Sequence, residues 1–140
     1  MSDSLWVYKV RNKDGKVIDF KYQDYNKKMD EAEEIVRELC DRLDEAYNLD
    51  LEYRYRGLGI GGDTLDWVLS LSSSSLSLIV IVNYTFDNKC CITIKDDDLF
   101  SDIKDVFSYT SDSVSDFLVT AQNAIEHIVL SKGDKIINIV

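Results

Sequence analysis

Residues 27–48 carry apolar side chains at intervals of three and four, and this pattern constrains the fold more than any other part of the chain. Such spacing places the apolar side chains on one stripe of an amphipathic helix. The stripe consists of Met29, Ala32, Val36, Leu39, Cys40, Leu43 and Tyr47. Because a helix of this kind is held by its packed face, the rest of the chain must supply an apolar surface to cover it.

Alternating apolar and polar residues before and after this helix predict a mainly antiparallel sheet. Residues 5–12 and 16–22 flank Asp14-Gly15, and an Asp-Gly pair readily supplies the positive φ values of a tight hairpin turn. Further strands are expected at residues 51–56, 65–71, 76–86 and 90–95. The last two are separated by a short turn near Asp87 and Asn88, which predicts an antiparallel pair.

The C-terminal part of the sequence is expected to return to helices. A short helix is predicted after Asp96-Asp97-Asp98, and its apolar residues would be Leu99, Phe100, Ile103, Val106 and Phe107. A longer helix should begin near Ser113, whose spacing to Asp116 resembles a capping box, and Gly133 is its expected stop. Residues 135–140 can then form a terminal strand.

These elements predict a single α+β domain spanning residues 1–140. Its sheet has about five to seven strands, with an N-terminal hairpin, a central meander, one long acidic helix after the hairpin and one or two C-terminal helices packed on the sheet. A chain of 140 residues with 45% hydrophobic residues can bury a core without a metal or disulfide. No export signal or membrane-spanning run is recognisable, so we expect a soluble, cytoplasmic protein with no membrane partner.

The residues needed for common catalytic mechanisms are scarce. His127 is the single histidine, and helical spacing predicts that it is exposed rather than catalytic. Cys90 and Cys91 are adjacent on a predicted strand, so they point to opposite faces and cannot bind one metal ion together. Three cysteines without an export signal are expected to stay reduced. We therefore predict no enzymatic activity, no catalytic residue, no metal site and no cofactor.

A glycine-rich segment offers an alternative function as a small-ligand-binding domain or minor enzyme. Gly57, Gly59 and Gly62 match G-x-G-x-x-G and follow a predicted strand. That motif holds phosphate only where a helix begins after it, whereas residues 65–71 alternate as a strand. A bent sheet connection is thus the preferred interpretation. In the alternative, the loop closes over a pocket lined by Tyr53, Tyr55 and Trp67.

The charge distribution is the main functional signal. The chain has 26 acidic residues against 16 Lys and Arg, for a net charge of −10, although residues 1–28 alone carry a net positive charge. Such acidity can serve solubility alone. Alternatively, residues 29–47 and 96–126 form one negative surface that docks on a basic groove, which is what nucleic-acid enzymes possess.

The second interpretation predicts a small non-enzymatic inhibitor that does not itself bind nucleic acid. It would act on a nucleic-acid-binding or nucleic-acid-cleaving protein, as toxin immunity proteins and phage anti-defence proteins do, although no residue motif ties the chain to either class. The preferred contacts are Glu34, Glu38, Asp41, Glu45, Asp98, Asp102 and Asp105. A third hypothesis is a structural or assembly subunit that associates through the aromatic hairpin or through an unpaired terminal strand. The oligomeric state is expected to be monomer or homodimer.

Overall fold

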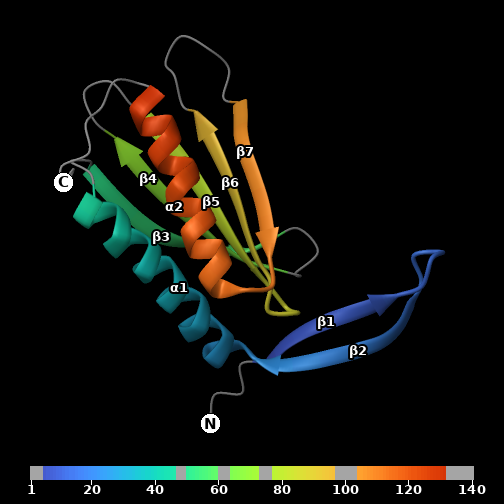
Figure 1. Ribbon diagram of the computed structural model, residues 1–140. Coiled ribbons are helices and arrows are strands. Elements are labelled where there is room, and N and C mark those ends of the chain that lie inside the picture. The colour runs from blue at the N-terminus through green and yellow to red at the C-terminus, as the bar shows by residue number, and fades with distance from the viewer. Residues whose placement is uncertain (1–4, 47–49, 60–63, 73–76, 97–103, 132–140) are drawn as a thin grey trace.

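The computed structural model describes residues 5–46, 50–59, 64–72, 77–96 and 104–131 (Figure 1). These residues form β1 (Leu5–Arg11), β2 (Val17–Asp24), α1 (Tyr25–Ala46), β3 (Asp50–Leu58), β4 (Thr64–Ser72), β5 (Ser77–Thr85), β6 (Cys90–Asp96), β7 (Lys104–Ser111) and α2 (Val114–Ser131). The predicted α+β class, the N-terminal hairpin and the long helix after it are confirmed.

The sheet that forms the centre of the molecule is an antiparallel meander. Its strand order, β3-β4-β5-β6-β7, is the order of the sequence, and β1 and β2 form a separate two-stranded sheet. Both helices lie on the same face of the five-stranded sheet, where α1 contacts β3 and β4 and α2 contacts β6 and β7 (Figure 1). Within the described residues, no helix covers the opposite face, as antiparallel sheets permit.

The core lies between the sheet and the two helices, and the alternation of the strands determines which residues enter it. On β4, Leu65, Trp67, Leu69 and Leu71 are all buried, as predicted, while the residues between them face the open side. The α1 stripe meets this surface through Ala32, Val36, Leu39 and Leu43. On α2, the fully buried side chains are Phe117, Ala121, Ile125 and Val129.

The hairpin β1–β2 projects from the body near the start of α1 (Figure 1). Aromatic contacts anchor it: the Trp6 ring meets the edge of Phe86 at 5.1 Å between centroids, and the Tyr8 ring stacks on it at 5.2 Å. Gln23 Nε2 donates to the Phe86 carbonyl oxygen at 2.7 Å. At the tip, Gly15 alone takes a positive φ, +80°, so the loop is wider than a two-residue Asp-Gly turn.

Both helices begin at a polar side chain that binds exposed backbone N–H groups. Asp24 Oδ1 accepts from the N–H groups of Asn26 and Lys27, so the first helix begins slightly earlier than the sequence pattern predicted. Ser113 Oγ accepts from the N–H of Asp116 at 3.3 Å, which confirms the predicted N-terminus of the second helix.

The predicted short helix after Asp98 is wrong for its last residues, because residues 104–111 form strand β7. Phe107 and Tyr109 are half-buried against the core while Ser108 and Thr110 are exposed, which is the two-residue period of a strand. β7 pairs with β6, with Ile92 opposite Tyr109. The first half of the predicted helix and the predicted strand at residues 135–140 lie outside the described residues.

Neither helix of the described chain has a sufficiently long apolar stretch to cross a lipid bilayer.

Candidate functional site

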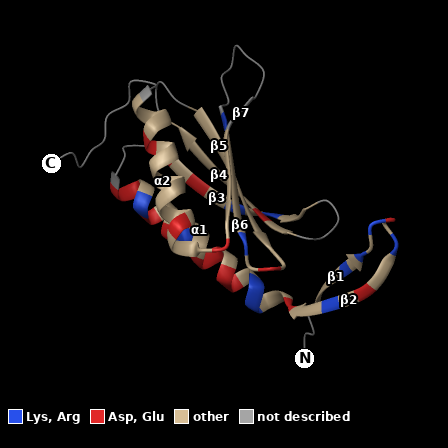
Figure 2. Cartoon of the chain, turned by 45° about the vertical axis from the view of Figure 1, so that its right-hand side comes forward, with Lys and Arg blue, Asp and Glu red and all other residues tan. Residues whose placement is uncertain are grey.

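The exposed face of α1 is the most acidic surface among the described residues (Figure 2). The helix turns its apolar stripe toward the sheet, so its charged residues face solvent. Between Tyr25 and Ala46 there are four basic residues, and the acidic residues are Asp30, Glu31, Glu33, Glu34, Glu38, Asp41, Asp44 and Glu45. By contrast, α2 contributes only Asp116 and Glu126 as charged residues, apart from His127.

The structure brings together only part of the predicted contact surface. Glu34, Glu38, Asp41 and Glu45 are all exposed on α1. Asp105 belongs instead to β7, the sheet edge opposite β3, and pairs in register with Lys95 of β6. Asp98 and Asp102 lie outside the described residues. The acidic surface is therefore centred on α1. Within the predicted extension over residues 96–126, the described acids whose side chains reach solvent are Asp112, which precedes α2, and Asp116 and Glu126 on α2.

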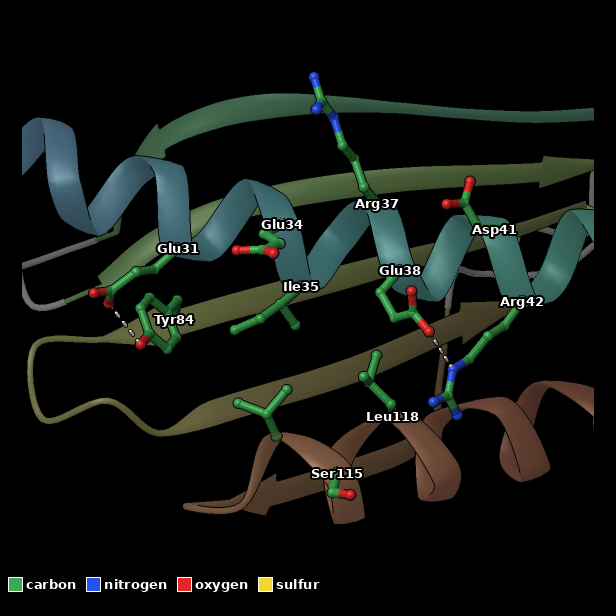
Figure 3. A pocket seen from close by; sticks show the side chains of 11 residues that line it. Glu31, Glu34, Ile35, Arg37, Glu38, Asp41, Arg42, Tyr84, Ser115 and Leu118 are labelled. Atoms are coloured by element: carbon green, nitrogen blue, oxygen red, sulfur yellow. Dashed lines mark hydrogen bonds and ion pairs between the residues drawn. The ribbon is translucent and has the colours of Figure 1, made fainter.

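A groove runs between α1 and α2, with a volume of about 680 Å³ (Figure 3). Its floor is apolar, because Ile35, Tyr84 and Leu118 line it and each is less than a tenth exposed. Charged residues of α1 form its rim, namely Glu31, Glu34, Arg37, Glu38, Asp41 and Arg42. Glu38 and Arg42 point toward α2, whereas Arg37 and Asp41 point away from it and stand on the outer side of the rim (Figure 3). We call this feature the acidic groove. It offers apolar area together with negative charge, which is the combination that receives a long basic side chain.

Two arginines neutralise part of the rim. Arg42 Nε lies 3.0 Å from Glu38 Oε1, and Arg37 Nη2 lies 2.9 Å from Glu33 Oε1, each an ion pair between residues four apart on the helix. No ion pair or hydrogen bond joins the side chains of Glu34 and Asp41 to any described residue. These two carboxylates therefore contribute most of the free negative charge of the rim.

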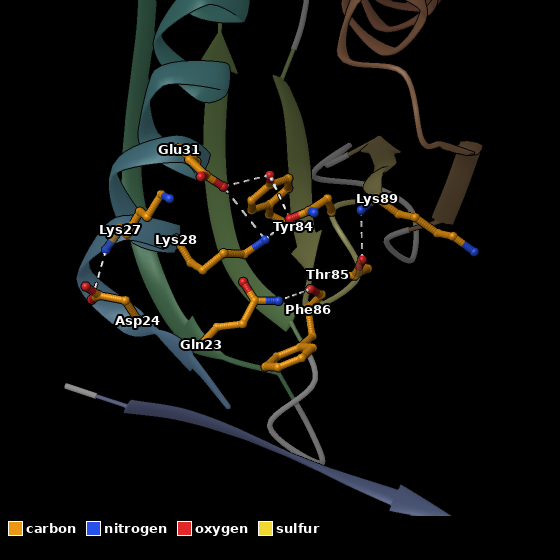
Figure 4. Close-up of polar contacts among 10 residues, drawn as sticks. Gln23, Asp24, Lys27, Lys28, Glu31, Tyr84, Thr85, Phe86 and Lys89 are labelled. Carbon is orange, nitrogen blue, oxygen red and sulfur yellow. Dashed lines mark hydrogen bonds and ion pairs between the residues drawn. The ribbon is translucent and has the colours of Figure 1, made fainter. Parts of the chain in front are cut away.

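At one end of the groove, a polar cluster surrounds Lys28 (Figure 4). The Lys28 side chain is only 3% exposed, and its Nζ donates to Asn88 Oδ1. The same Nζ lies 3.8 Å from Glu31 Oε2 and 4.2 Å from the centre of the Tyr84 ring. The Tyr84 hydroxyl donates to Glu31 Oε2 at 3.1 Å. The cluster ties the start of α1 to the turn after β5, where Asn88 has a φ of +65°.

Burial dominates the proton affinities in this cluster. It lowers the pKa of Lys28, while the negative charge of Glu31 acts in the opposite direction. Burial also raises the pKa of Tyr84, and the hydrogen bond to Glu31 adds to that effect. The sequence does not predict this cluster, because a lysine at a helix start is usually exposed. The one signal was its position, since Lys28 stands four residues before Ala32, which places it at the edge of the apolar stripe.

The alternative ligand site is divided between the two faces of the sheet. Trp67 is buried on the helix side, and the rings of Tyr53 and Tyr55 lie against it at 6.1 Å and 5.3 Å. Tyr55 exchanges a hydrogen bond with the Tyr25 hydroxyl, and Tyr53 accepts one from Arg37 Nε. All three aromatic residues therefore pack beneath or beside α1, and none of them lines the hollow that the described part of the glycine segment adjoins.

The glycine segment itself adjoins a different hollow, of about 490 Å³, on the open face of the sheet. Gly57 forms a bulge with a φ of +127°, and the N–H of Gly59 donates to the Thr64 carbonyl oxygen. Gly62 lies outside the described residues. Strand β4 follows the loop, so no helix N-terminus stands where a phosphate-binding motif requires one. Asp66 in this hollow is already occupied by hydrogen bonds from Thr64 and Asn83.

The described residues contain neither a metal-binding arrangement of side chains nor a thiol activated as a nucleophile. No group of three or more His, Cys, Asp or Glu side chains converges there in a metal-binding arrangement. Cys90 is buried and Cys91 is half-buried on the other face, as their adjacency predicted. Burial raises the pKa of Cys40 to about 12 and of Cys90 to about 11, which keeps both thiols protonated at neutral pH. His127 is exposed on α2.

Comparison with known proteins found no family model that matches the chain, no curated protein similar to it in sequence and no solved structure similar to it in fold.

Proposed function

We propose that this chain is a small, non-enzymatic binding protein whose acidic groove docks on a basic surface of another protein. The observation that carries the proposal is the pairing of an apolar floor with the free carboxylates of Glu34 and Asp41 on its rim. A surface that served solubility alone would need charge but no apolar hollow beside it. The partner we infer is a nucleic-acid-binding or nucleic-acid-cleaving protein, whose basic groove is occupied and thereby inhibited.

The arrangement of charges along α1 supports a role beyond stability. Glu34 stands one helical turn from Asp30 on one side and from Glu38 on the other, and like charges at this spacing each destabilise a helix by about 0.2–0.5 kcal/mol. Asp41 and Glu45 form another such pair. A helix selected only for stability would alternate acids and bases along this face. A helix that presents acids to a partner accepts this small cost.

The groove also suggests how the contact is built. Arginine and lysine side chains of the partner would lay their aliphatic stems on Ile35 and Leu118 and bring their charged ends to the rim. Charge attraction of this kind steers the encounter, so it acts mainly on the association rate and is weakened by salt. Phosphate groups would compete for the same basic residues on the partner.

Affinity capture with two matched double variants tests the proposal. Glu34→Lys with Asp41→Lys reverses the free charges of the rim, whereas Asp50→Lys with Glu52→Lys makes the same change in net charge on exposed β3 residues away from the groove. The native chain and the β3 variant should retain the same basic protein from a host extract, and the rim variant should lose it. Added duplex DNA should release that protein from the native chain.

The purified partner then allows a kinetic test. Its association rate with the native chain should fall steeply as salt rises from low to physiological concentration, with a smaller dependence for the rim variant. Equal retention by both double variants would exclude the acidic groove as the docking surface. A partner that duplex DNA does not displace would exclude a nucleic-acid-binding surface as the target of the groove.

A further inference from the structure

The hairpin β1–β2 has two apolar faces, of which the body covers only one. Trp6 and Tyr8 pack on Phe86. The register pairs Val7 with Tyr22 and Lys9 with Phe20, so the side chains of Val7, Phe20 and Tyr22 emerge on the face opposite Trp6 and Tyr8. That face carries Leu5, Val7, Ile18, Phe20 and Tyr22, which are 60%, 40%, 61%, 47% and 59% exposed. We call these five residues the hairpin strip.

The hairpin strip exposes more apolar surface than is usual for a folded domain. It contains five of the nine large hydrophobic residues that are exposed among the described residues. Contiguous apolar patches on a soluble domain mark sites of interaction. A two-stranded hairpin is also marginally stable by itself in water, and this one is anchored only at its base.

The charge around the strip indicates what covers it. Between Leu5 and Asp24 the hairpin has five Lys and Arg residues against three aspartates, whereas α1 has eight acids against four bases. A basic, apolar arm is therefore complementary to the acidic groove, which has an apolar floor and an acidic rim. Figures 1 and 2 show the hairpin projecting away from the body, so the groove that it meets belongs to another molecule.

The lengths of the two surfaces agree. Ile18 is six residue steps from Asp24, the partner of Leu5, and at 3.3 Å per step the strip is about 20 Å long. The groove extends along α1 from Glu31 to Arg42, which are eleven residue steps apart and span about 16 Å at 1.5 Å per step. Four or five side chains of the strip can thus contact the groove at once.

We propose that two copies of this chain form a symmetric dimer in which the hairpin strip of each lies in the acidic groove of the other. The inference rests on the proposed function, because the second copy occupies the surface assigned to the basic partner. Dimerisation and partner binding then exclude each other, and the dimer is the resting form from which the partner displaces the hairpins. Reciprocal exchange makes the contact closed, so it ends at two copies.

Sedimentation velocity of the full chain over about a hundredfold range of concentration tests this arrangement. The native chain should be a dimer that dissociates more readily as salt rises. Phe20→Asp should raise the dimer dissociation constant about tenfold or more, and so should the rim variant Glu34→Lys with Asp41→Lys. Leu130→Asp is the matched control, because Leu130 is 48% exposed on α2 and does not line the groove, and this variant should remain dimeric. Circular dichroism should show all variants to be folded.

Mixing the two defective variants gives the sharper result. Phe20→Asp retains an intact groove and the rim variant retains an intact hairpin strip, so together they should form a heterodimer through one of the two contacts. A monomeric native chain at every concentration would overturn the proposal, and so would a dimer that loses stability with Phe20→Asp while the rim variant dimerises normally. Phe20→Asp leaves the acidic groove unchanged, so this variant should bind the basic partner whether or not the native chain dimerises. A failure of the dimer is therefore distinct from a failure of the proposed function.

Discussion

Strand β5 and the N-terminal hairpin have the same kind of sequence, with apolar residues on both faces, yet their outward side chains meet different fates. Ile79 and Ile81 of β5 point to the open face of the sheet and are only half-exposed at most, because β4 and β6 flank them on both sides. Phe20 and Tyr22 of the hairpin are 47% and 59% exposed. Each hairpin strand has one neighbour, so nothing shields its outward residues from the side.

The comparison teaches that strand pattern alone does not decide exposure. Two neighbouring strands remove part of the outward apolar surface of a strand from water, even where no second layer covers that face of the sheet. The body can therefore bury most of its apolar strand residues within one chain. The hairpin cannot, and this difference is the physical reason why we infer that the hairpin contacts another molecule. The predictions that follow test this division between a self-sufficient body and an incomplete hairpin.

The largest expected difference is between two phenylalanines. Phe117 of α2 is 0% exposed, so Phe117→Ala should lower the free energy of unfolding by about 3–5 kcal/mol. Phe20→Ala should change it by less than about 0.5 kcal/mol, because its ring packs on little within one chain. Urea denaturation at low protein concentration, where association contributes least, measures both values. Comparable losses would show that the hairpin strip is packed within the monomer.

The junction between the start of α1 and the turn after β5 depends on Lys28. Lys28→Ala removes the hydrogen bond to Asn88, the contact with the Tyr84 ring and the charge opposite Glu31, and should cost about 1–3 kcal/mol. Its neighbour Lys27 is exposed, so Lys27→Ala should cost less than about 0.5 kcal/mol. Denaturation of the two variants side by side gives the comparison, and equal small losses would mean that the polar cluster does not hold the junction.

A buried thiol makes the stability of the body depend on alkaline pH. Burial raises the pKa of Cys40 from 9.0 to about 12, so above pH 9 the unfolded chain releases this proton while the folded chain keeps it. The stability that Cys40 contributes is present below pH 9 and is lost as pH rises toward 12, by at most about 1.4 kcal/mol per pH unit. Cys40→Ala should therefore flatten the fall in unfolding free energy between pH 9 and 11, and an unchanged slope would contradict burial as the cause.

Much of this architecture was predictable from the sequence because local patterns and tertiary packing agree. The α1 stripe, the alternation of β4 and the Ser113 cap all appear where the spacing places them. The prediction was wrong for strand β7. The spacing of Ile103, Val106 and Phe107 is typical of a helix. Residues 104–111 form a strand because they pair with the outer edge of β6, a tertiary contact that local spacing does not predict.

The candidate site was predictable only in part. Helical periodicity alone placed Glu34, Glu38 and Asp41 on one exposed face. The floor of the groove was not accessible to such reasoning, because Tyr84 and Leu118 come from β5 and α2 and meet Ile35 only after the sheet and both helices have assembled. The same holds for Lys28, whose burial depends on a turn sixty residues away. Contacts of this range carry no periodic signal.

The smallest expected effect separates charge for binding from charge for stability. Glu34→Lys replaces two repulsive contacts on α1, with Asp30 and Glu38, by two attractive ones, so the variant should be about 0.5 kcal/mol more stable than the native chain. Its affinity for the basic partner should nevertheless fall about five- to tenfold, and Glu52→Lys on β3 should leave that affinity unchanged. Thermal denaturation and binding kinetics on the same preparations measure the two quantities. If stability rises and affinity does not fall, the acids of α1 serve solubility. If stability rises while affinity falls, this face of the body, like the hairpin strip, serves contact with another molecule.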